Sequence, residues 1–411
     1  MEEERHPLST ICEHIFCKIC MEKVKTSHKC PLCNNKYFLQ SHLFKAIIDG
    51  KFREAERIIK YDPSSVNQMS DEDGITPIFV ASFFGRESFV KLFLEANANI
   101  HAKNDDGLTS VMSTIQGINQ FENPIPHENV VRLLLEKNAN VKHQALRGYT
   151  ALIFAIFAKN EIIVEYILRH DPSSVNQNDI NGDTPLHHAS FDGQVEIVKL
   201  LLDFNANVNA KDFVQTSTPL FSAIASNSKE NVNIVKLLLE KNADVEYQVA
   251  TSTLQGDTPL MAAVIARNKN IVNQLIEKNA NTISQVNLLG VKALDWSFLN
   301  IPNKYDSSIA TFLIESDLSD VNRIVNSDNS WTPLFCAVLH KDENLVKLLI
   351  KNGANTQHID KHGCSALFYA RETNFTNIVH LLSEKDVHSF KYWILLLIIL
   401  SLYANLFFKG F

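Results

Sequence analysis

Cysteine is nearly absent from most of this sequence. Of seven cysteines in 411 residues, five lie within the first 33 positions, and only Cys336 and Cys364 fall elsewhere. Clustering of this kind favours a metal site over a disulfide framework. The chain opens on glutamates and has no apolar run there, so we expect no signal peptide and reduced thiols.

Long basic blocks are also absent. The formal net charge is -7 and the isoelectric point is about 6.1, which argues against a surface that follows nucleic-acid phosphates. No combination of residues typical of catalysis occurs between residues 41 and 387, so we predict no catalytic residue and no small-molecule substrate there. A chain of this length exceeds one ordinary hydrophobic core and should consist of several domains or stacked repeats.

A repeat of 33 or 34 residues fills the long middle of the chain, from residue 41 to 387, with insertions in three units. Each unit has a marker, usually threonine, followed in most units by proline or a small residue: Thr76, Thr109, Thr150, Thr184, Thr218, Thr258, Lys292, Thr332 and Ser365. Glycine two residues before most markers predicts a turn with positive φ. The marker itself predicts a helix N-cap, because its hydroxyl can accept from a free backbone N–H.

A second apolar run in each unit has helical spacing, as from Ile197 to Leu202. We expect this second helix to stop at residues that tolerate the left-handed conformation, namely Asn97, Asn138, Asn205, Asn242, Asn279 or Gly353. Two copies of Asp-Pro-Ser-Ser-Val-Asn-Gln, at 62–68 and 171–177, suggest that several repeats were duplicated together. The pattern predicts stacked helix-turn-helix units.

These units resemble the ankyrin repeat, whose pattern reads G-x-T-P-L-H-x-A-A, then I-V-x-L-L-L, then G-A-D-V-N-A. The segment from Gly182 to Ser190, with its continuation to Ala210, reproduces nearly the whole pattern. The resemblance implies an all-α ankyrin-repeat solenoid with hairpin-like tips, in nine repeats after a degenerate unit at 43–68. In this family, the histidine at the place of His187 belongs to the repeat's own turn rather than to a ligand site.

The resemblance also implies that a protein partner binds the concave face of the array. Seven residues after the markers, most positions are apolar. We predict a partner-binding stripe there, which with the adjacent Phe84 comprises Phe83, Phe157, Phe191, Ile265, Leu299 and Leu339. The competing interpretation is that these phenylalanines fill gaps between neighbouring repeats.

The cysteine-rich start, residues 1–40, has a metal-binding pattern. Three close-set pairs of ligands stand there: Cys12 and His14, Cys17 and Cys20, Cys30 and Cys33. Each C-x2-C pair can present two thiolates to a tetrahedral zinc ion, so we predict zinc as the cofactor. A module of this size cannot build a core alone, and zinc would supply its folding energy.

The order of these ligands resembles the last six of the eight in a RING finger, the module of ubiquitin ligases. The resemblance implies that the first and last pairs form a complete second zinc site and that the middle pair is half of the first. Alternatively, the last two pairs form a single four-cysteine site. The chain is then either a ligase whose finger recruits a ubiquitin-conjugating enzyme while the array selects substrates, or a non-enzymatic ankyrin scaffold with a structural finger.

An uncharged run closes the chain, from Tyr392 to Phe408, with Lys391 and Lys409 on its flanks. As a helix it would be about 25 Å long, near the lower limit for a bilayer core. Aromatic residues at both ends are typical of membrane interfaces. We therefore predict a C-terminal transmembrane anchor at 391–409, with the body at the cytoplasmic face of an intracellular membrane; the alternative is a helix that caps the last repeat.

Overall fold

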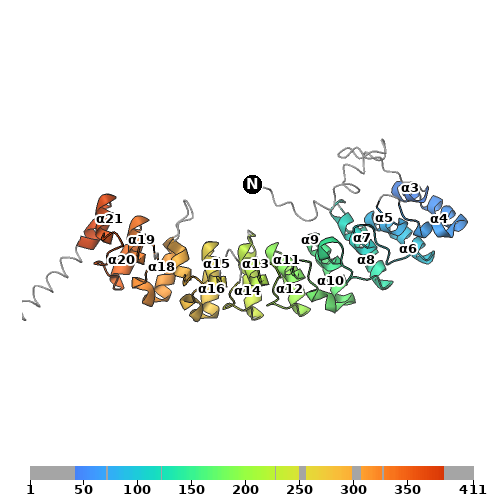
Figure 1. Cartoon of the computed structure of the whole chain (residues 1–411). Coiled ribbons are helices and arrows are strands. Elements are labelled where there is room, and N and C mark those ends of the chain that lie inside the picture. The colour runs from blue at the N-terminus through green and yellow to red at the C-terminus, as the bar shows by residue number, and fades with distance from the viewer. Residues whose placement is uncertain are drawn as a thin grey trace, which may run out of the picture. The chain divides into compact units, whose positions relative to one another are not determined.

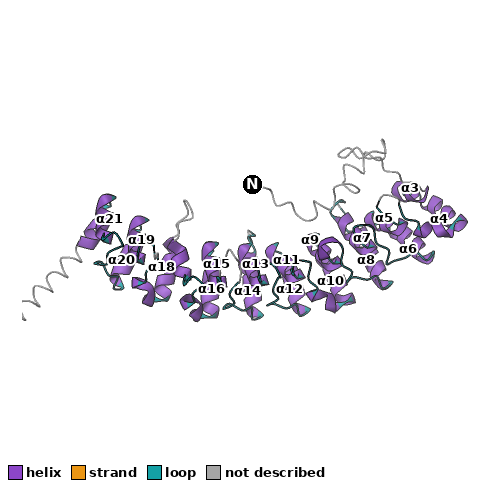
Figure 2. Cartoon of the chain, viewed as in Figure 1, coloured by secondary structure: helices purple, strands orange, loops and turns teal. Residues whose placement is uncertain are grey.

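The computed structural model describes residues 42–70, 73–121, 123–226, 228–249, 256–298, 307–325 and 328–383. The chain divides into two compact units, unit 1 ending at Ala243 and unit 2 beginning at Asp244. Figure 2 shows that helices dominate the described residues of both units, which confirms the predicted all-α class. The predicted zinc module at 1–40 and the predicted anchor at 391–409 lie outside the described residues.

Helix pairs build unit 1, with one pair to each repeat. The pairs are α3 (His42–Asp49) with α4 (Phe52–Tyr61), α5 (Pro77–Phe83) with α6 (Glu87–Glu95), α7 (Ser110–Ile118) with α8 (Ile125–Glu136), α9 (Ala151–Phe157) with α10 (Glu161–His170), α11 (Pro185–Phe191) with α12 (Val195–Asp203), and α13 (Pro219–Ala225) with α14 (Asn231–Glu240). First helices pack on first helices of the next repeat, as α5 on α7, and second helices on second helices, as α6 on α8. Within unit 1, Figure 1 shows the resulting two layers.

Unit 2 repeats this plan. Its labelled helices are α15 (Pro259–Ile265), α16 (Lys269–Lys278), α17 (Ala293–Phe298), α18 (Ser307–Ser316), α19 (Pro333–Leu339), α20 (Glu343–Lys351) and α21 (Ala366–Glu372), and residues 376–383, at the end of the described part, are also helical. Again α15 packs on α17 and α19 on α21, while α16 packs on α18 and α18 on α20. Short 3-10 helices lie between repeats, as η1 (Pro63–Asn67) and η3 (Pro172–Asn176) in unit 1, and η4 (Ala280–Ser284) and η5 (Leu318–Asn322) in unit 2.

The first helices begin at the markers, as predicted. The Thr150 hydroxyl accepts the backbone N–H of Ile153 at 3.3 Å, and every residue of α9 behind it is buried. At the start of α11, Nδ1 of His187 accepts the backbone N–H of Thr184 at 3.1 Å, and Nε2 donates to the carbonyl of Ser217 at 3.2 Å. His187 thus joins its own turn to the next repeat, which confirms its structural role.

The second helices stop mostly as predicted. Asn97, Asn138, Asn205 and Asn242 have φ between 58° and 62°, and Gly353 has a φ of 86°. The prediction is wrong at Asn279, where φ is -155°. There the side chain accepts the N–H of Asn281 at 3.0 Å and caps η4, so the chain turns into a 3-10 helix without a left-handed residue.

The two copies of the heptapeptide fold alike and connect repeats. Each forms a 3-10 helix, η1 or η3, whose last residue is asparagine. The carboxamide oxygen of Asn67 accepts the N–H of Asn99 at 2.7 Å, and that of Asn176 accepts the N–H of Asn207 at 2.7 Å. The asparagine at the sixth place of each heptapeptide therefore holds the next repeat.

The prediction of a transmembrane helix must be corrected. None of the helices in the described ranges is long and apolar enough to cross a membrane. The longest, α8, has 12 residues, and at about 1.5 Å per residue it reaches little more than half of a bilayer core of about 30 Å. The structure therefore supports the ankyrin-type solenoid but not the membrane-spanning element of the predicted fold.

Candidate protein-binding surface

The predicted stripe on the first helices is not uniformly exposed. Phe83 and Phe157 are buried, with 1% and 7% of their surface exposed, whereas Phe191 is 53% exposed. Phe84, Ile265 and Leu339 are half-buried, and Leu299 lies outside the described residues. The structure therefore does not bring the described members together as one exposed stripe, and within unit 1 only Phe191 offers a largely free ring.

Neighbouring repeats decide which of these rings is covered. The Phe157 ring meets the His188 ring of the next repeat edge-on, with centroids 5.1 Å apart. Phe83 is covered in the same way by Phe121, at 6.2 Å, which comes from the insertion after α7. The residue that corresponds to His188 in the repeat after Phe191 is Ser222, whose short side chain leaves the Phe191 ring exposed.

The tips between repeats carry a second set of exposed apolar side chains in unit 1. Leu146, Ile180 and Phe213 are 60%, 70% and 70% exposed, and Val214 beside Phe213 is 69% exposed. The first three, which we call the tip row, stand four or five residues before the markers of three consecutive repeats. Solvent-facing apolar residues at the same place in neighbouring repeats form a repeated feature rather than scattered exposure.

Backbone hydrogen bonds hold the tip row in position. The N–H of Ile180 donates to the carbonyl of Arg147 at 3.0 Å, and the N–H of Phe213 donates to the carbonyl of Asn181 at 2.7 Å. Glycine permits this approach, because a Cβ at Gly182, where φ is +89°, would lie 2.5 Å from the backbone nitrogen of Phe213. Each tip is thus fixed against the preceding one.

A polar cluster supports the tip at Ile180. Oδ1 of Asp179 accepts the N–H groups of Asn181 and Asp183, and its Oδ2 lies 3.2 Å from Nε2 of His188. Burial raises the pKa of the Asp183 carboxyl to about 6, against the opposing effect of His188. Asp179, Asp183 and His188 place their ligand atoms within 4.8 Å of one another, close enough to hold a metal ion, yet Oδ1 of Asp179 already accepts two N–H groups of the turn and its Oδ2 is next to His188 of α11.

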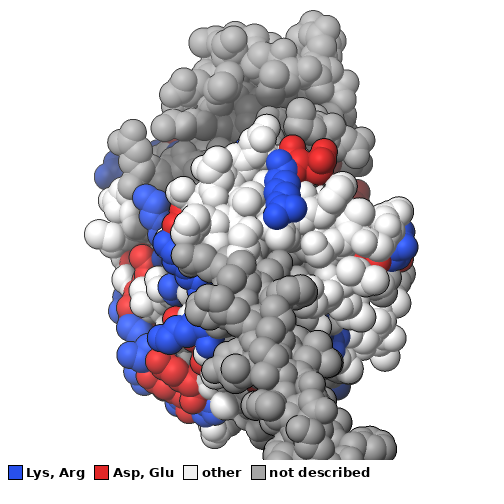
Figure 3. All heavy atoms as spheres, turned by 90° about the vertical axis from the view of Figure 1, so that its left-hand side faces the viewer, with Lys and Arg blue, Asp and Glu red and all other residues white. Residues whose placement is uncertain are grey.

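Unit 2 has an apolar tip of its own. Leu288 and Leu289 are 75% and 65% exposed at the tip before α17. In α21, Phe368 is 47% exposed. Figure 3 views the chain from the side at which α21 lies. On this face much of the described surface is uncharged, and charges of both signs lie mainly along the left edge, with a few near the top and at the right-hand edge.

The predicted zinc ligands lie outside the described residues: Cys12, His14, Cys17, Cys20, Cys30 and Cys33. Of the two cysteines within the described part, Cys336 is buried in α19, and burial raises the pKa of its thiol to about 12. A thiol with such a pKa stays protonated and is a poor nucleophile or metal ligand. Its role is packing.

Comparison with known proteins decides the family. A family model described as ankyrin repeats in three copies matches residues 122–212, 213–286 and 298–391, more than half of the chain. The chain belongs to the ankyrin-repeat family. Further ankyrin models match residues 73–105 and 186–239 of the array.

Relatives match this ankyrin array over part of their length. Rabankyrin-5 of Mus musculus is 30% identical over 162 residues, which are 38% of this chain and 13% of that protein. A protein of Oryza sativa subsp. japonica named "Probable E3 ubiquitin-protein ligase XBOS32" is 28% identical over 196 residues, 40% of this chain and 38% of that protein. The crystal structure of the ankyrin repeat domain of Bcl-3 aligns at 23% identity with a TM-score of 0.49, covering 58% of this chain and 98% of that one. The chain therefore spans well under half of the length of the first two relatives.

The tip row of the ankyrin array was not among the predicted partner-binding residues. The signal is present in the sequence, because turns seldom carry large apolar residues and Leu146, Ile180 and Phe213 recur at matching places. The tip row lies outside the first-helix positions on which the predicted stripe was based.

Proposed function

We propose that this chain binds its protein partner through the tip row of unit 1, with Phe191 as a second contact. That the ankyrin array serves protein–protein interaction follows from its family. The choice of surface rests on one observation, the exposure of 60–70% at the same tip position in three consecutive repeats. Exposed apolar side chains that recur in this way are a usual feature of binding surfaces.

The energetics favour such a surface. Complete burial of a leucine, isoleucine or phenylalanine side chain contributes about 1.5–3 kcal/mol, so three tips that are still mostly exposed retain most of that free energy for binding. The backbone links between tips reduce the ordering cost of association, because the contacts are already held in place. The tip row therefore combines available apolar area with preorganisation.

A binding experiment with matched variants tests the surface. A partner would first be captured by chemical cross-linking to the purified full chain, and its affinity then measured by calorimetry. We expect Ile180→Ala and Phe213→Ala each to weaken binding at least about tenfold, as at a central hot spot, without lowering the unfolding temperature. Ile162→Ala is the control, because Ile162 is an exposed isoleucine of α10, 46% exposed, away from the tips. Equal affinity of all variants would refute the tip-row surface.

We propose separately that residues 1–40 bind zinc. The support is the ligand spacing, in which Cys30 and Cys33 are required whichever pairing is correct. The purified chain should contain zinc by elemental analysis, and replacing both residues by serine should remove it. A zinc content at background in the unaltered chain would contradict the proposal. Replacing Cys12 and His14 together should release zinc only in the RING-like arrangement.

A ligase role is the second candidate function. It is favoured by the RING-like order of the ligands and by the match of the array to the relative named as a probable E3 ubiquitin-protein ligase. In this role the finger recruits a ubiquitin-conjugating enzyme and positions its thioester while the array holds the substrate. Reconstituted ubiquitin transfer with a panel of conjugating enzymes should then depend on Cys30 and Cys33. Zinc binding without any transfer would favour the scaffold alternative.

A further inference from the structure

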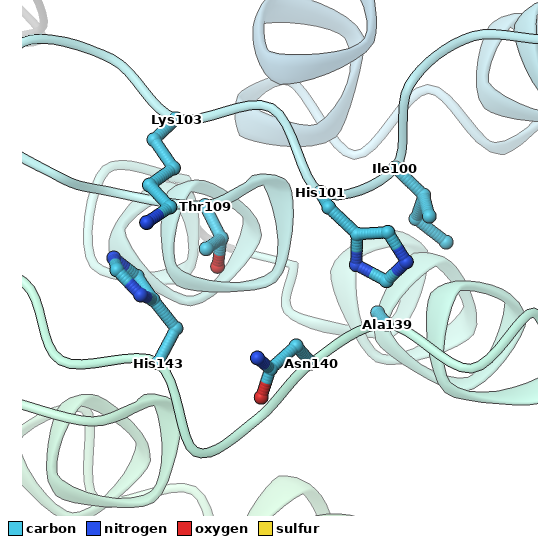
Figure 4. A pocket seen from close by; sticks show the side chains of 7 residues that line it. All are labelled: Ile100, His101, Lys103, Thr109, Ala139, Asn140 and His143. Carbon is cyan, nitrogen blue, oxygen red and sulfur yellow. The ribbon is translucent and has the colours of Figure 1, made fainter.

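A pocket lies between the loops of two neighbouring repeats in unit 1. Its volume is about 290 Å³, and it is lined by Ile100, His101, Lys103 and Thr109 of one repeat and by Ala139, Asn140 and His143 of the next. Figure 4 shows Lys103 and His143 at one end and His101, Ile100 and Ala139 at the other. This volume is at the lower limit of small-molecule sites and suits one side chain or one small anion.

The pocket has more hydrogen-bond donors than acceptors among its polar side chains. No acidic side chain is among the described residues that line it. Lys103 is exposed and its ammonium forms no ion pair with any described residue, and the His101 ring is likewise without a partner there. Lys142, next to the pocket, is already paired with Asp171 at 3.1 Å. An unneutralised ammonium in a recess favours an anionic ligand.

His143 adds a group that responds to an anion. Its Nε2 donates to the carbonyl of Gly107 at 2.9 Å, so in the neutral ring Nδ1 carries the lone pair. Burial, and secondarily the charge of Lys103, lower the pKa of this imidazole. Along the chain, the acidic residues nearest to Lys103 are Asp105 and Asp106 at the tip, and the one nearest to His143 is Glu136 at the end of α8; none of them is part of the lining. A bound anion would offset the effect of Lys103 and favour the imidazolium, with Nδ1–H as a new donor.

We propose that this pocket binds an oxyanion, a carboxylate or phosphate group, between the Lys103 ammonium and the His143 ring. The Thr109 hydroxyl and the Asn140 amide lie between the two ends of the pocket, where they can orient the ligand. His143 is three residues before Leu146, the first member of the tip row. In the complex, the ligand is an acidic or phosphorylated side chain of the partner; this last step rests on the proposed tip-row surface, whereas oxyanion binding does not.

Sulfate is a suitable probe, because its charge is constant from about pH 8 to about pH 6, where histidine titrates. It would be titrated into the full chain at constant ionic strength and followed by calorimetry. We expect saturable binding that Lys103→Gln weakens at least about tenfold, the usual loss for a charge-assisted hydrogen bond. Lys137→Gln, an exposed lysine of the same unit outside the lining, should bind as the unaltered chain does. Binding should tighten as the pH falls, and His143→Gln should reduce that trend, which replacement of His101, the other histidine of the lining, together with His143 should abolish.

Absence of saturable sulfate binding, or equal weakening by Lys103→Gln and Lys137→Gln, would overturn the site. A parallel titration with acetate separates the two ligand classes, since tighter acetate binding supports a carboxylate and tighter sulfate binding supports a phosphate. Failure of the tip-row surface would appear differently, as a partner affinity that tip variants leave unchanged while sulfate still binds. If sulfate binds but Lys103→Gln leaves the partner's affinity unchanged, only the claim that a side chain of the partner occupies the pocket is refuted.

Discussion

Phe157 and Phe191 occupy the same position of consecutive repeats, yet 7% of one and 53% of the other is exposed. A phenylalanine offers about 200 Å² for burial, so Phe157 buries about 90 Å² more than Phe191, worth about 2 kcal/mol at about 25 cal/mol per Å². Truncation of Phe157 also leaves a cavity beneath His188 and Tyr149, whose rings lie 5.1 and 5.3 Å away. We therefore expect Phe157→Ala to cost about 3–5 kcal/mol and Phe191→Ala about 1–2 kcal/mol of unfolding free energy.

Urea denaturation of the full-length variants measures these differences. Stacked repeats can unfold in parts, so hydrogen exchange of α9 and α11 should accompany it and assign each loss to its repeat. Exchange should accelerate strongly in α9 of Phe157→Ala and only slightly in α11 of Phe191→Ala. Similar losses of stability in both variants would refute the reasoning from neighbouring-repeat coverage. The result also fixes which of the two rings remains free for a partner.

Three further predictions concern turns and buried charges. Gly182→Ala should lower the unfolding temperature more than Gly290→Ala. Both glycines have positive φ, but of the two only Gly182 has a backbone atom where an added Cβ would lie. Equal losses would contradict the close approach of the tips. Asp183→Asn should stabilise the chain by about 1 kcal/mol at neutral pH, after allowance for solvent screening at this partly exposed group. The raised pKa means that the ionised form is penalised in the folded state, so this advantage should fade as the pH falls from about 6 to about 4 in a series of urea titrations. Asp320→Ala should lower the free energy of unfolding by about 3 kcal/mol, because it removes the carboxylate 2.8 Å from the Lys292 ammonium, whose side chain is only 12% exposed. A loss within the error of denaturant titration would show that water replaces the carboxylate.

Local features of the fold follow closely from local sequence. The glycines before the markers have positive φ, and four of five predicted asparagine stops are left-handed, because a turn or helix end depends on a few adjacent residues. Asn279 differs because its side chain accepts the backbone N–H two residues ahead and caps η4 instead. An asparagine can serve as a helix stop or as a cap, and the pattern alone does not choose between them.

Exposure and recesses depend on residues far along the chain. Phe83 is covered by Phe121 of an insertion, and Phe157 by His188 of the next repeat, so position within a repeat does not decide burial. The oxyanion pocket joins loops about one repeat apart, and Lys103 and His143 carry no recognisable joint motif. Such arrangements emerge only when neighbouring repeats are stacked.

The backbone links between the tips of unit 1 also constrain what the array can recognise. Since each tip is fixed to the one before it, Leu146, Ile180 and Phe213 cannot shift independently to suit a ligand. A bound protein must then present its contacts with the period of the repeats, whatever side chains it uses. Selection by spacing tolerates exchange of one apolar residue for another at a tip. One residue inserted into a single tip, by contrast, would displace that tip relative to the tips of both neighbouring repeats.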